Sequence, residues 1–213
     1  MSGASLPIRV GVLLSGSGTS LENLLEHIDA GKLPARVAVV VASKQQAFGL
    51  ERARRRGIPA LAVPRRLHPE VKEFNDRLHE ALEPHDLDLV LLLGFLSPFE
   101  LRGRYEGRTL NVHPALVPAF SGQGFYGRRV HEAVLESGVR QSGATVHFAD
   151  PEYDRGPIVL QEAVPVLEDD TVETLSERVQ AAERRLVPEA VRLFAEGRLA
   201  IEGRRVRILP ESP

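Results

Sequence analysis

The segment IRVGVLLSGSGTSLENLLEHIDAGK, residues 8–32, indicates how the chain folds. Its opening IRVGVLL is a mostly apolar run, which is typical of a strand buried on both faces of a sheet. Gly16 and Gly18 permit a tight turn, and Thr19 or Ser20 is placed to cap a helix. Apolar residues then recur at helical spacing until a glycine ends the pattern. A strand joined to a helix by a glycine-rich turn is the repeating unit of an α/β protein.

The rest of the chain repeats this alternation. Further strands are expected at residues 36–43, 58–64, 87–93, at a segment ending at residue 113, at 142–149 and at 157–164. Helices are expected at residues 47–57, 69–83, 97–107 as a short link, near 128–137, and at 171–195 with a bend near Pro188. The tail resembles a small hairpin around Gly203. The alternation predicts an α/β fold with a doubly wound, mostly parallel sheet, in a single domain covering residues 1–213.

Composition excludes several classes of protein. Of the 213 residues, 43% are apolar and 26% are charged, which is ordinary for a globular protein. The net charge of −2 gives no general attraction to nucleic acid or to a membrane surface. The absence of cysteine excludes disulfide and thiolate chemistry and makes cytoplasmic residence the simplest interpretation. We expect neither a membrane helix nor a secretory signal, because no long apolar run is present.

The first glycine-rich turn has two interpretations. SGSGTS, residues 15–20, is either a structural turn or a phosphate site built on the free N–H groups of a helix N-terminus. A dinucleotide fingerprint would require a third glycine near position 21, where the chain has Leu21. We therefore favour a phosphate site over a dinucleotide site. The basic run RARRR, residues 52–56, is interpreted as a helix C-terminus followed by Gly57 rather than as a second phosphate site.

Polar side chains are expected where the segment NVHPALVPAF, residues 111–120, leaves its strand. Asn111 and His113 share one strand face because alternate residues point the same way. Pro114 cannot donate to a sheet ladder, so the strand should end near His113. In an open parallel sheet this carboxyl end is where ligands bind. His113 is thus either catalytic or a hydrogen-bonded histidine at a strand end.

A second polar region lies in ATVHFADPEYDRGPIVLQ, residues 144–161, which reads as two strands joined by an acidic loop. The carboxylates Asp150, Glu152 and Asp154 either solvate this turn or assist the strand-end Asn and His in holding an oxyanion and moving a proton. Three acids without cysteine or clustered histidine do not make a convincing zinc site, and nothing supports magnesium. His147 is explained by packing and one hydrogen bond.

Together these segments resemble the phosphoribosylglycinamide formyltransferase family over about residues 8–200. The motifs that carry the resemblance are LLSGSGTSLENLL, SKQQAFGLERAR, GFLSPF, LNVHPALVPAF, GATVHFADPEYDRGPIVLQ and RVQAAERRLVP. The resemblance implies a single Rossmann-like α/β domain. It also implies transfer of the formyl group of 10-formyltetrahydrofolate to the amine of glycinamide ribonucleotide, in de novo purine biosynthesis and without a metal. These two small molecules would be the partners, and a homodimer is left open.

The resemblance also implies residue roles. The catalytic trio would be Asn111, His113 and Asp154. The ribonucleotide would be bound by Gly18, Thr19 and Ser20 at its phosphate and by Gln180 and Glu183, which lie three residues apart on one helical face. The folate would be bound by Phe95, Leu96, Ser97 and Asn111, and by the loop residues Asp150, Pro151, Glu152, Tyr153 and Asp154.

The chain departs from the family pattern at three places. Ser20 stands where the family usually has asparagine, and GFLSPF is shorter than usual and lacks an arginine often found there. The basic residue that the family often places before the helix near residue 71 could be Arg65, Arg66 or Lys72. None of these changes removes a member of the expected catalytic trio.

The expected mechanism uses a protonated His113. Asn111 and the imidazolium would stabilise a tetrahedral oxyanion, and Asp154 would keep His113 charged and help to relay a proton. A formyltetrahydrofolate hydrolase would be expected to carry an N-terminal regulatory domain, and a methionyl-tRNA formyltransferase a C-terminal RNA-binding domain. A non-catalytic folate or nucleotide sensor would not need the trio, and a nicotinamide dehydrogenase is disfavoured by the missing third glycine.

Overall fold

The structure is a computed structural model that describes residues 7–211. These residues form two compact units, one ending at Thr109 and the other beginning at Leu110. The prediction of one domain over residues 1–213 stays a prediction, and both ends of that range lie outside the described residues.

The first unit contains alternating strands and helices. Its strands are β1 (Ile8–Leu14), β2 (Ala35–Ala42), β3 (Ala60–Ala62) and β4 (Leu89–Leu92). Its helices are α1 (Thr19–Asp29), α2 (Phe48–Arg55) and α3 (Val71–Leu82), with the short 3₁₀ turns η1 (Arg65–Leu67) and η2 (Glu83–His85). The strands are ordered β3-β2-β1-β4, and each neighbouring pair is parallel. This arrangement confirms the α/β fold and parallel sheet that the sequence predicts.

The apolar run of β1 is buried as the sequence predicts. Val10, Val12, Leu13 and Leu14 have no exposed surface, so consecutive residues on both faces of the strand are covered. The inward face of α1 buries leucines at positions 21, 24 and 25, which are spaced for one side of a helix. The hydrophobic pattern therefore accounts for both elements of the first strand–helix unit.

The short helix expected at residues 97–107 is wrong. The segment forms turns, and Arg102 and Gly103 have φ angles of 51° and 69°. These angles lie in the left-handed region, which a right-handed helix cannot include. Pro98 also disfavours helical geometry at the residue before it. The segment is therefore an irregular loop between β4 and the strand that follows.

The second unit mixes long antiparallel strands with two helices. Its strands are β5 (Thr109–His113), which starts at the boundary between the units, β6 (Gln141–Phe148), β7 (Ile158–Pro165), β8 (Leu199–Glu202) and β9 (Arg205–Ile208). Its helices are α4 (Arg128–Ser137) and α5 (Val172–Ala195). The order is β5-β6-β7-β9-β8. Within this unit the neighbouring strands pair antiparallel, except β7 with β9, which pair parallel.

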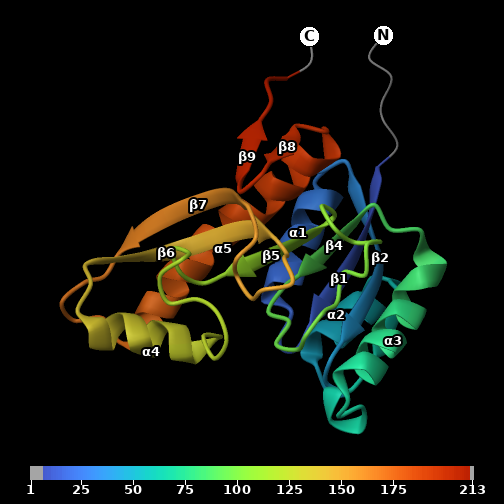
Figure 1. The fold of residues 1–213 in the computed structure, drawn as a ribbon, viewed down its shortest axis with the longest axis horizontal. Coiled ribbons are helices and arrows are strands. Elements are labelled where there is room, and N and C mark those ends of the chain that lie inside the picture. Colours follow the sequence, from blue (N-terminus) through green and yellow to red (C-terminus); the bar gives the residue numbers. More distant parts are fainter. Residues whose placement is uncertain (1–6, 212–213) are drawn as a thin grey trace. The chain divides into compact units, whose positions relative to one another are not determined.

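Helix α5 organises the second unit. It packs against β6 and β7, and α4 packs against α5 (Figure 1). The helix starts with a capping box in which Thr171 and Thr174 exchange hydrogen bonds, and it continues through Pro188. Strands β8 and β9 form the expected hairpin, with Gly203 at a φ of 61° in its turn. Within the described part of the chain, no helix combines the length and apolar character needed to cross a membrane.

Candidate active site

Strand β5 brings Asn111 and His113 to one face, as the two-residue period predicts. In the antiparallel ladder with β6, Asn111 lies directly opposite His147, and His113 lies opposite Thr145. Residues that are directly opposite in a ladder share a sheet face. All four side chains therefore lie on the same face of the β5–β6 ladder. His113 and His147 are 4% and 2% exposed, so this polar face is buried.

Asp154 reaches the same cluster from the loop between β6 and β7. One carboxylate oxygen, Oδ1, accepts from Asn111 Nδ2 at 3.3 Å and lies 3.5 Å from His147 Nε2. The other, Oδ2, lies 3.4 Å from His113 Nδ1 and accepts from the backbone N–H of Gly122 at 2.9 Å. The carboxylate thus contacts three of the four side chains on this face, those of Asn111, His113 and His147. The predicted trio of Asn111, His113 and Asp154 is brought together in the second unit.

The loop that carries Asp154 depends on a close backbone approach. A Cβ on Gly156 would lie 1.8 Å from the carbonyl oxygen of Phe148, a separation that no side chain can adopt. The backbone N–H of Phe148 also donates to the carbonyl of Pro157 at 2.9 Å. Asp154 itself has a φ of 55°, which aspartate tolerates better than most residues. The glycine therefore lets the loop return tightly enough to aim the Asp154 carboxylate.

Both histidine rings are anchored in the same way. His113 Nε2 donates to the carbonyl of Phe120 at 2.8 Å, and Phe120 adopts a left-handed φ of 50°. His147 Nδ1 donates to the carbonyl of Phe148 at 2.8 Å. Each ring therefore uses one nitrogen to donate outward to the backbone and turns its other nitrogen toward Asp154. In the neutral rings these inner nitrogens are hydrogen-bond acceptors, and His147 Nε2 accepts from Asn111 Nδ2 at 3.0 Å.

The loop after β5 is held by a buried threonine. Thr145 Oγ1 donates to the carbonyl of Ala115 at 2.7 Å and accepts from the backbone N–H of Val117 at 3.2 Å. Gln161 Nε2 donates to Thr145 Oγ1 and to the carbonyl of Val117, both at 2.9 Å. This network fixes the chain that leads from His113 to the carbonyl of Phe120. The orientation of the His113 ring is thus set by the second strand of the ladder.

Burial and partners set the charges of the cluster. Burial acts to raise the pKa of Asp154, but its contact with His147, the charge of His113 and the Gly122 N–H outweigh it, so the pKa lies below the ordinary value. Burial lowers the pKa of His113, and the attraction of Asp154 and the Phe120 carbonyl does not fully oppose it. In the free protein at neutral pH, Asp154 is therefore ionised and His113 is mainly neutral. The expected role of a protonated His113 beside the oxyanion concerns the reacting complex and stays a prediction.

The other acids of the loop differ from Asp154. Asp150 and Glu152 are exposed, and the Asp150 carboxylate accepts from the backbone N–H of Glu152 at 3.1 Å. That contact is a local turn of the kind aspartate often forms. Of the three carboxylates that the sequence leaves open, Asp154 joins the buried cluster, and the other two face solvent. No group of three or more His, Asp or Glu side chains within residues 7–211 is arranged to hold a metal ion.

In the first unit, the glycine-rich turn presents backbone rather than side chains. Gly18 precedes α1 with a left-handed φ of 72°, and a Cβ there would lie 2.6 Å from the Cα of Gly49. The expected side-chain cap from Thr19 or Ser20 is wrong, since α1 begins at Thr19 and Gly18 occupies the capping position without a side chain. The first N–H groups of a helix have no partner within the helix, so this end suits an anion.

The segment Phe95–Ser97 also lies in the first unit. Phe95 stacks against Phe74 of α3 with ring centroids 6.4 Å apart. The backbone N–H of Leu96 donates to Ser15 Oγ at 2.9 Å, while the Leu96 side chain is 49% exposed. The segment is thus fixed at its backbone and open at one side chain. Its predicted folate contacts stay a prediction.

The last two predicted site residues lie on α5. Gln180 is exposed and donates to Ser176 Oγ at 3.0 Å. Glu183 is half-buried, and burial raises its pKa to about 7, with the charge of Arg184 opposing that change. Their assignment to the ribonucleotide stays a prediction.

Comparison with known proteins identifies the family. The model of the formyl transferase family matches residues 8–191, which is most of the chain. The chain belongs to the formyl transferase family. The resemblance noted in the sequence motifs is confirmed at this level.

Members of this family with known structures and names are similar over nearly the whole chain. The crystal structure of glycinamide ribonucleotide transformylase 1 from Symbiobacterium toebii is 48% identical, with a TM-score of 0.90, and the match covers 98% of this chain and 96% of that one. A phosphoribosylglycinamide formyltransferase of Haemophilus influenzae is 34% identical over 91% of this chain and 90% of its own length. The trifunctional purine biosynthetic protein adenosine-3 of Bos taurus is 40% identical over 92% of this chain, which spans 19% of that protein.

Contributors to the cluster that the sequence does not predict as site residues include His147, Phe120 and Gly156. His147 was interpreted as a packing residue, but it contacts both Asn111 and Asp154. The signal that could have found it is its position opposite Asn111, which requires the strand register. Phe120 and Gly156 act through the backbone, and their side-chain types carry no sign of that role.

Proposed function

We propose that the chain is a phosphoribosylglycinamide formyltransferase, which transfers the formyl group of 10-formyltetrahydrofolate to the amine of glycinamide ribonucleotide. The observation that carries the proposal is the cluster in which ionised Asp154 faces one nitrogen each of His113 and His147. The ionised Asp154 carboxylate and Nδ1 of the neutral His113 ring are both acceptors, so this pair can take up a proton. An amine that attacks a carbonyl carbon must lose one. The names of the family members similar to this chain support glycinamide ribonucleotide as the acceptor and a formyl group as what is transferred.

The reaction follows from these charges. The amine nitrogen bonds to the formyl carbon, and the carbonyl electrons move onto oxygen to give a tetrahedral oxyanion. The proton released by the amine passes to the His113–Asp154 pair, directly or through water, and makes His113 an imidazolium. When the bond between the formyl carbon and the folate nitrogen breaks, that nitrogen receives the proton. His113 thus acts first as a base and then as an acid.

Asn111 is the donor proposed for the oxyanion. Its Nδ2 carries two hydrogens and contacts His147 and Asp154 in the free protein. The substrate must therefore draw one N–H from its resting partner, as often occurs when a catalytic complex forms. A donor of this kind is typically worth about 2.7–4 kcal/mol of transition-state stabilisation.

The substrate phosphate is assigned to the turn at Gly18, Thr19 and Ser20. The free N–H groups at the start of α1 support this assignment. Gly18→Val adds a side chain at a left-handed φ and against the Gly49 backbone, so it should raise the Michaelis constant for the ribonucleotide far more than that for the folate. Equal effects on the two constants would remove the assignment.

The remaining assignments complete the proposal. The folate pterin is read by the segment Phe95–Ser97 and by the loop 150–154, and the ribonucleotide is also contacted by Gln180 and Glu183. The enzyme uses no metal, acts in the cytoplasm in de novo purine biosynthesis, and forms one functional domain. It binds neither nucleic acid nor membrane, and a homodimer is left open.

The decisive experiment is a turnover assay with the full chain, glycinamide ribonucleotide and 10-formyltetrahydrofolate, followed by folate absorbance. We expect folate release that requires the ribonucleotide and yields the formylated product. Formate release without the ribonucleotide would instead identify a hydrolase. Binding of both ligands without turnover would identify a sensor, and either result would overturn the proposal.

A further inference from the structure

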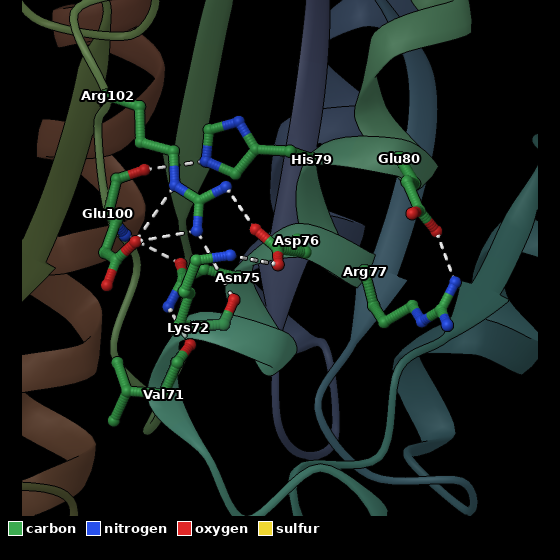
Figure 2. A network of polar contacts seen from close by, with 9 residues as sticks. All are labelled: Val71, Lys72, Asn75, Asp76, Arg77, His79, Glu80, Glu100 and Arg102. Atoms are coloured by element: carbon green, nitrogen blue, oxygen red, sulfur yellow. Dashed lines mark hydrogen bonds and ion pairs between the residues drawn. The ribbon is translucent and has the colours of Figure 1, made fainter.

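Helix α3 holds the backbone N–H and C=O of Glu100 by two side chains (Figure 2). The backbone N–H of Glu100 donates to Asn75 Oδ1 at 2.8 Å, and the Glu100 carbonyl accepts from His79 Nε2 at 2.7 Å. Asn75 and His79 are four residues apart, so they lie on the same face of the helix. Together they bond the backbone N–H and C=O of Glu100, the two groups that a neighbouring strand would bind in a sheet. We call this pair of contacts the α3 clamp.

Asn75 is an unusual residue for its position in the helix. It has no exposed surface and lies among the apolar residues Phe74 and Leu78, which are also fully buried. Its Nδ2 donates to the carbonyl of Val71 at 3.0 Å, so both ends of the buried amide are bonded. A buried amide is tolerated when its groups are paired, and it then fixes one geometry. Across the loop, Asn75 thereby fixes the backbone N–H of Glu100.

His79 donates to the backbone carbonyl of the same residue, Glu100, and packs against aromatic rings. Its ring is stacked on Phe99 with centroids 5.6 Å apart, and it lies 5.4 Å from the ring of Tyr105. Burial lowers the pKa of His79, which keeps the ring mainly neutral at neutral pH. Because the Glu100 carbonyl can only accept, the single N–H of the neutral ring must lie on Nε2. The tautomer is therefore fixed by the clamp.

Arg102 reinforces the clamp at the surface (Figure 2). Its guanidinium donates to Asp76 Oδ1 at 2.7 Å and to Glu100 Oε2 at 2.9 Å. A third, longer contact of 3.3 Å reaches the carbonyl of Lys72. These charged side chains are partly exposed, so we expect their ion pairs to contribute little to stability. They nevertheless orient the chain just after Glu100 toward α3.

We propose that Asn75 and His79 are positioning residues that set the backbone of the segment Phe95–Ser97 for folate recognition. The inference rests on the proposed function. The segment has no regular secondary structure, and its backbone is held on one side by Ser15 and on the other by the α3 clamp. Only Pro98 and Phe99 separate Ser97 from Glu100, so a shift of the Glu100 backbone should move the backbone of the segment Phe95–Ser97. A segment that reads a ring through its main chain depends on such fixed points.

The test replaces His79 by phenylalanine, which keeps an aromatic ring against Phe99 but removes the donor. We expect the dissociation constant for 5-formyltetrahydrofolate, measured by calorimetry, to rise about tenfold, because the partly buried Glu100 carbonyl loses its hydrogen-bond donor. Ribonucleotide binding and kcat should change little. His79→Gln, which can donate again, should restore much of the affinity. Arg77→Ala is the matched control, since Arg77 pairs with Glu80 on the same helix and points away from the clamp (Figure 2).

Two results would overturn the inference. One is unchanged folate affinity in His79→Phe, with the wild-type chain binding normally. The other is an equal loss of folate and ribonucleotide affinity with a lower melting temperature, which would indicate general destabilisation. A wild-type chain that binds no folate would instead overturn the proposed function and the inference with it. A wild-type chain that binds folate without formyl transfer would overturn only the proposed activity.

Discussion

The loop that carries Asp154 and the face of α5 that carries Glu183 shift the pKa of a carboxylate in opposite directions. Both carboxylates lose water on folding. The pKa of Asp154 nevertheless falls, because ring nitrogens and the Gly122 N–H surround it, whereas the pKa of Glu183 rises to about 7. The comparison shows that burial without partners raises the pKa of a carboxylate, and that donors or positive charges are needed to lower it. Titratable groups whose pKa values are shifted in opposite directions by their surroundings are typical of functional sites.

The largest effect should come from removing the charge at the centre of the cluster. Asp154→Asn keeps the shape but neither attracts an imidazolium nor accepts a proton well, so kcat should fall about a thousandfold or more. Because Asp154 raises the pKa of His113 against the effect of burial, that pKa should fall further in the variant. Single-turnover rates and an NMR titration of His113 measure the two effects.

The matched control for this change is Asp169→Asn, which removes an exposed carboxylate from another loop of the same unit. It should leave both kcat and the His113 titration unchanged. An Asp154→Asn variant with near-normal turnover, or with an unmoved His113 titration, would contradict the role given to the cluster.

A smaller loss should follow from displacing the loop without changing any polar group. Gly156→Ala places a methyl group 1.8 Å from the Phe148 carbonyl oxygen, so the backbone must move. Moving a catalytic group by about 1 Å can cost about a hundredfold in rate. We expect that loss in kcat together with a lower melting temperature. Gly16→Ala, where nothing lies within 4 Å of the added carbon, tests the methyl group alone for its effect on stability. A Gly156→Ala variant of normal kcat would show that the loop tolerates movement.

His147 should contribute less than Asp154 but more than a packing residue. His147→Asn removes the ring nitrogen that contacts Asp154 and accepts from Asn111. The loss of the hydrogen bond with Asn111 is worth about 0.5–1.5 kcal/mol, so kcat should fall by up to about tenfold. The free energy of unfolding in urea, measured at the same pH, shows whether the fall in kcat comes from lost stability. A variant that loses stability but keeps kcat would restore the interpretation of His147 as structural.

The sequence could predict the parts of this site that follow from residue type and periodicity. Asn111 and His113 share a face because strands have a period of two, and Pro114 marks where that strand ends. The choice of Asp154 among three acids followed from the family resemblance. The structure supports it with contacts to both histidines.

The sequence could not predict what depends on register, backbone conformation or burial. His147 joins the site only because β6 pairs with β5 in the register that sets it opposite Asn111. The expected helix at 97–107 fails because Arg102 adopts a left-handed φ, which its residue type does not signal. The sequence predicts that Asp154 favours the charged form of His113, but the opposing effect of burial on the His113 pKa is a property of the folded chain.

The smallest effect should appear at Glu183, as a change of stability with pH. Its pKa is raised from 4.5 to about 7 in the folded chain. A raised pKa gives a contribution to stability that is complete below the unfolded value near 4.5 and is lost as the pH rises through 7. Glu183→Gln removes this dependence. Relative to wild type, the variant should therefore gain on the order of 1 kcal/mol between about pH 4.5 and pH 8, after allowance for partial exposure.

Urea unfolding of both proteins across this pH range measures the difference directly. Glu177→Gln, at an exposed position of the same helix, should give a difference that does not vary with pH. A pH-independent difference for Glu183→Gln would mean that the carboxylate finds partners in solution, and the contrast with Asp154 would then fail. If Glu183 also contacts the ribonucleotide, the Michaelis constant of wild type should change near pH 7, and that change should disappear in Glu183→Gln. Because the pH dependence of the Michaelis constant is measured separately from stability, it tests the contact between Glu183 and the ribonucleotide independently.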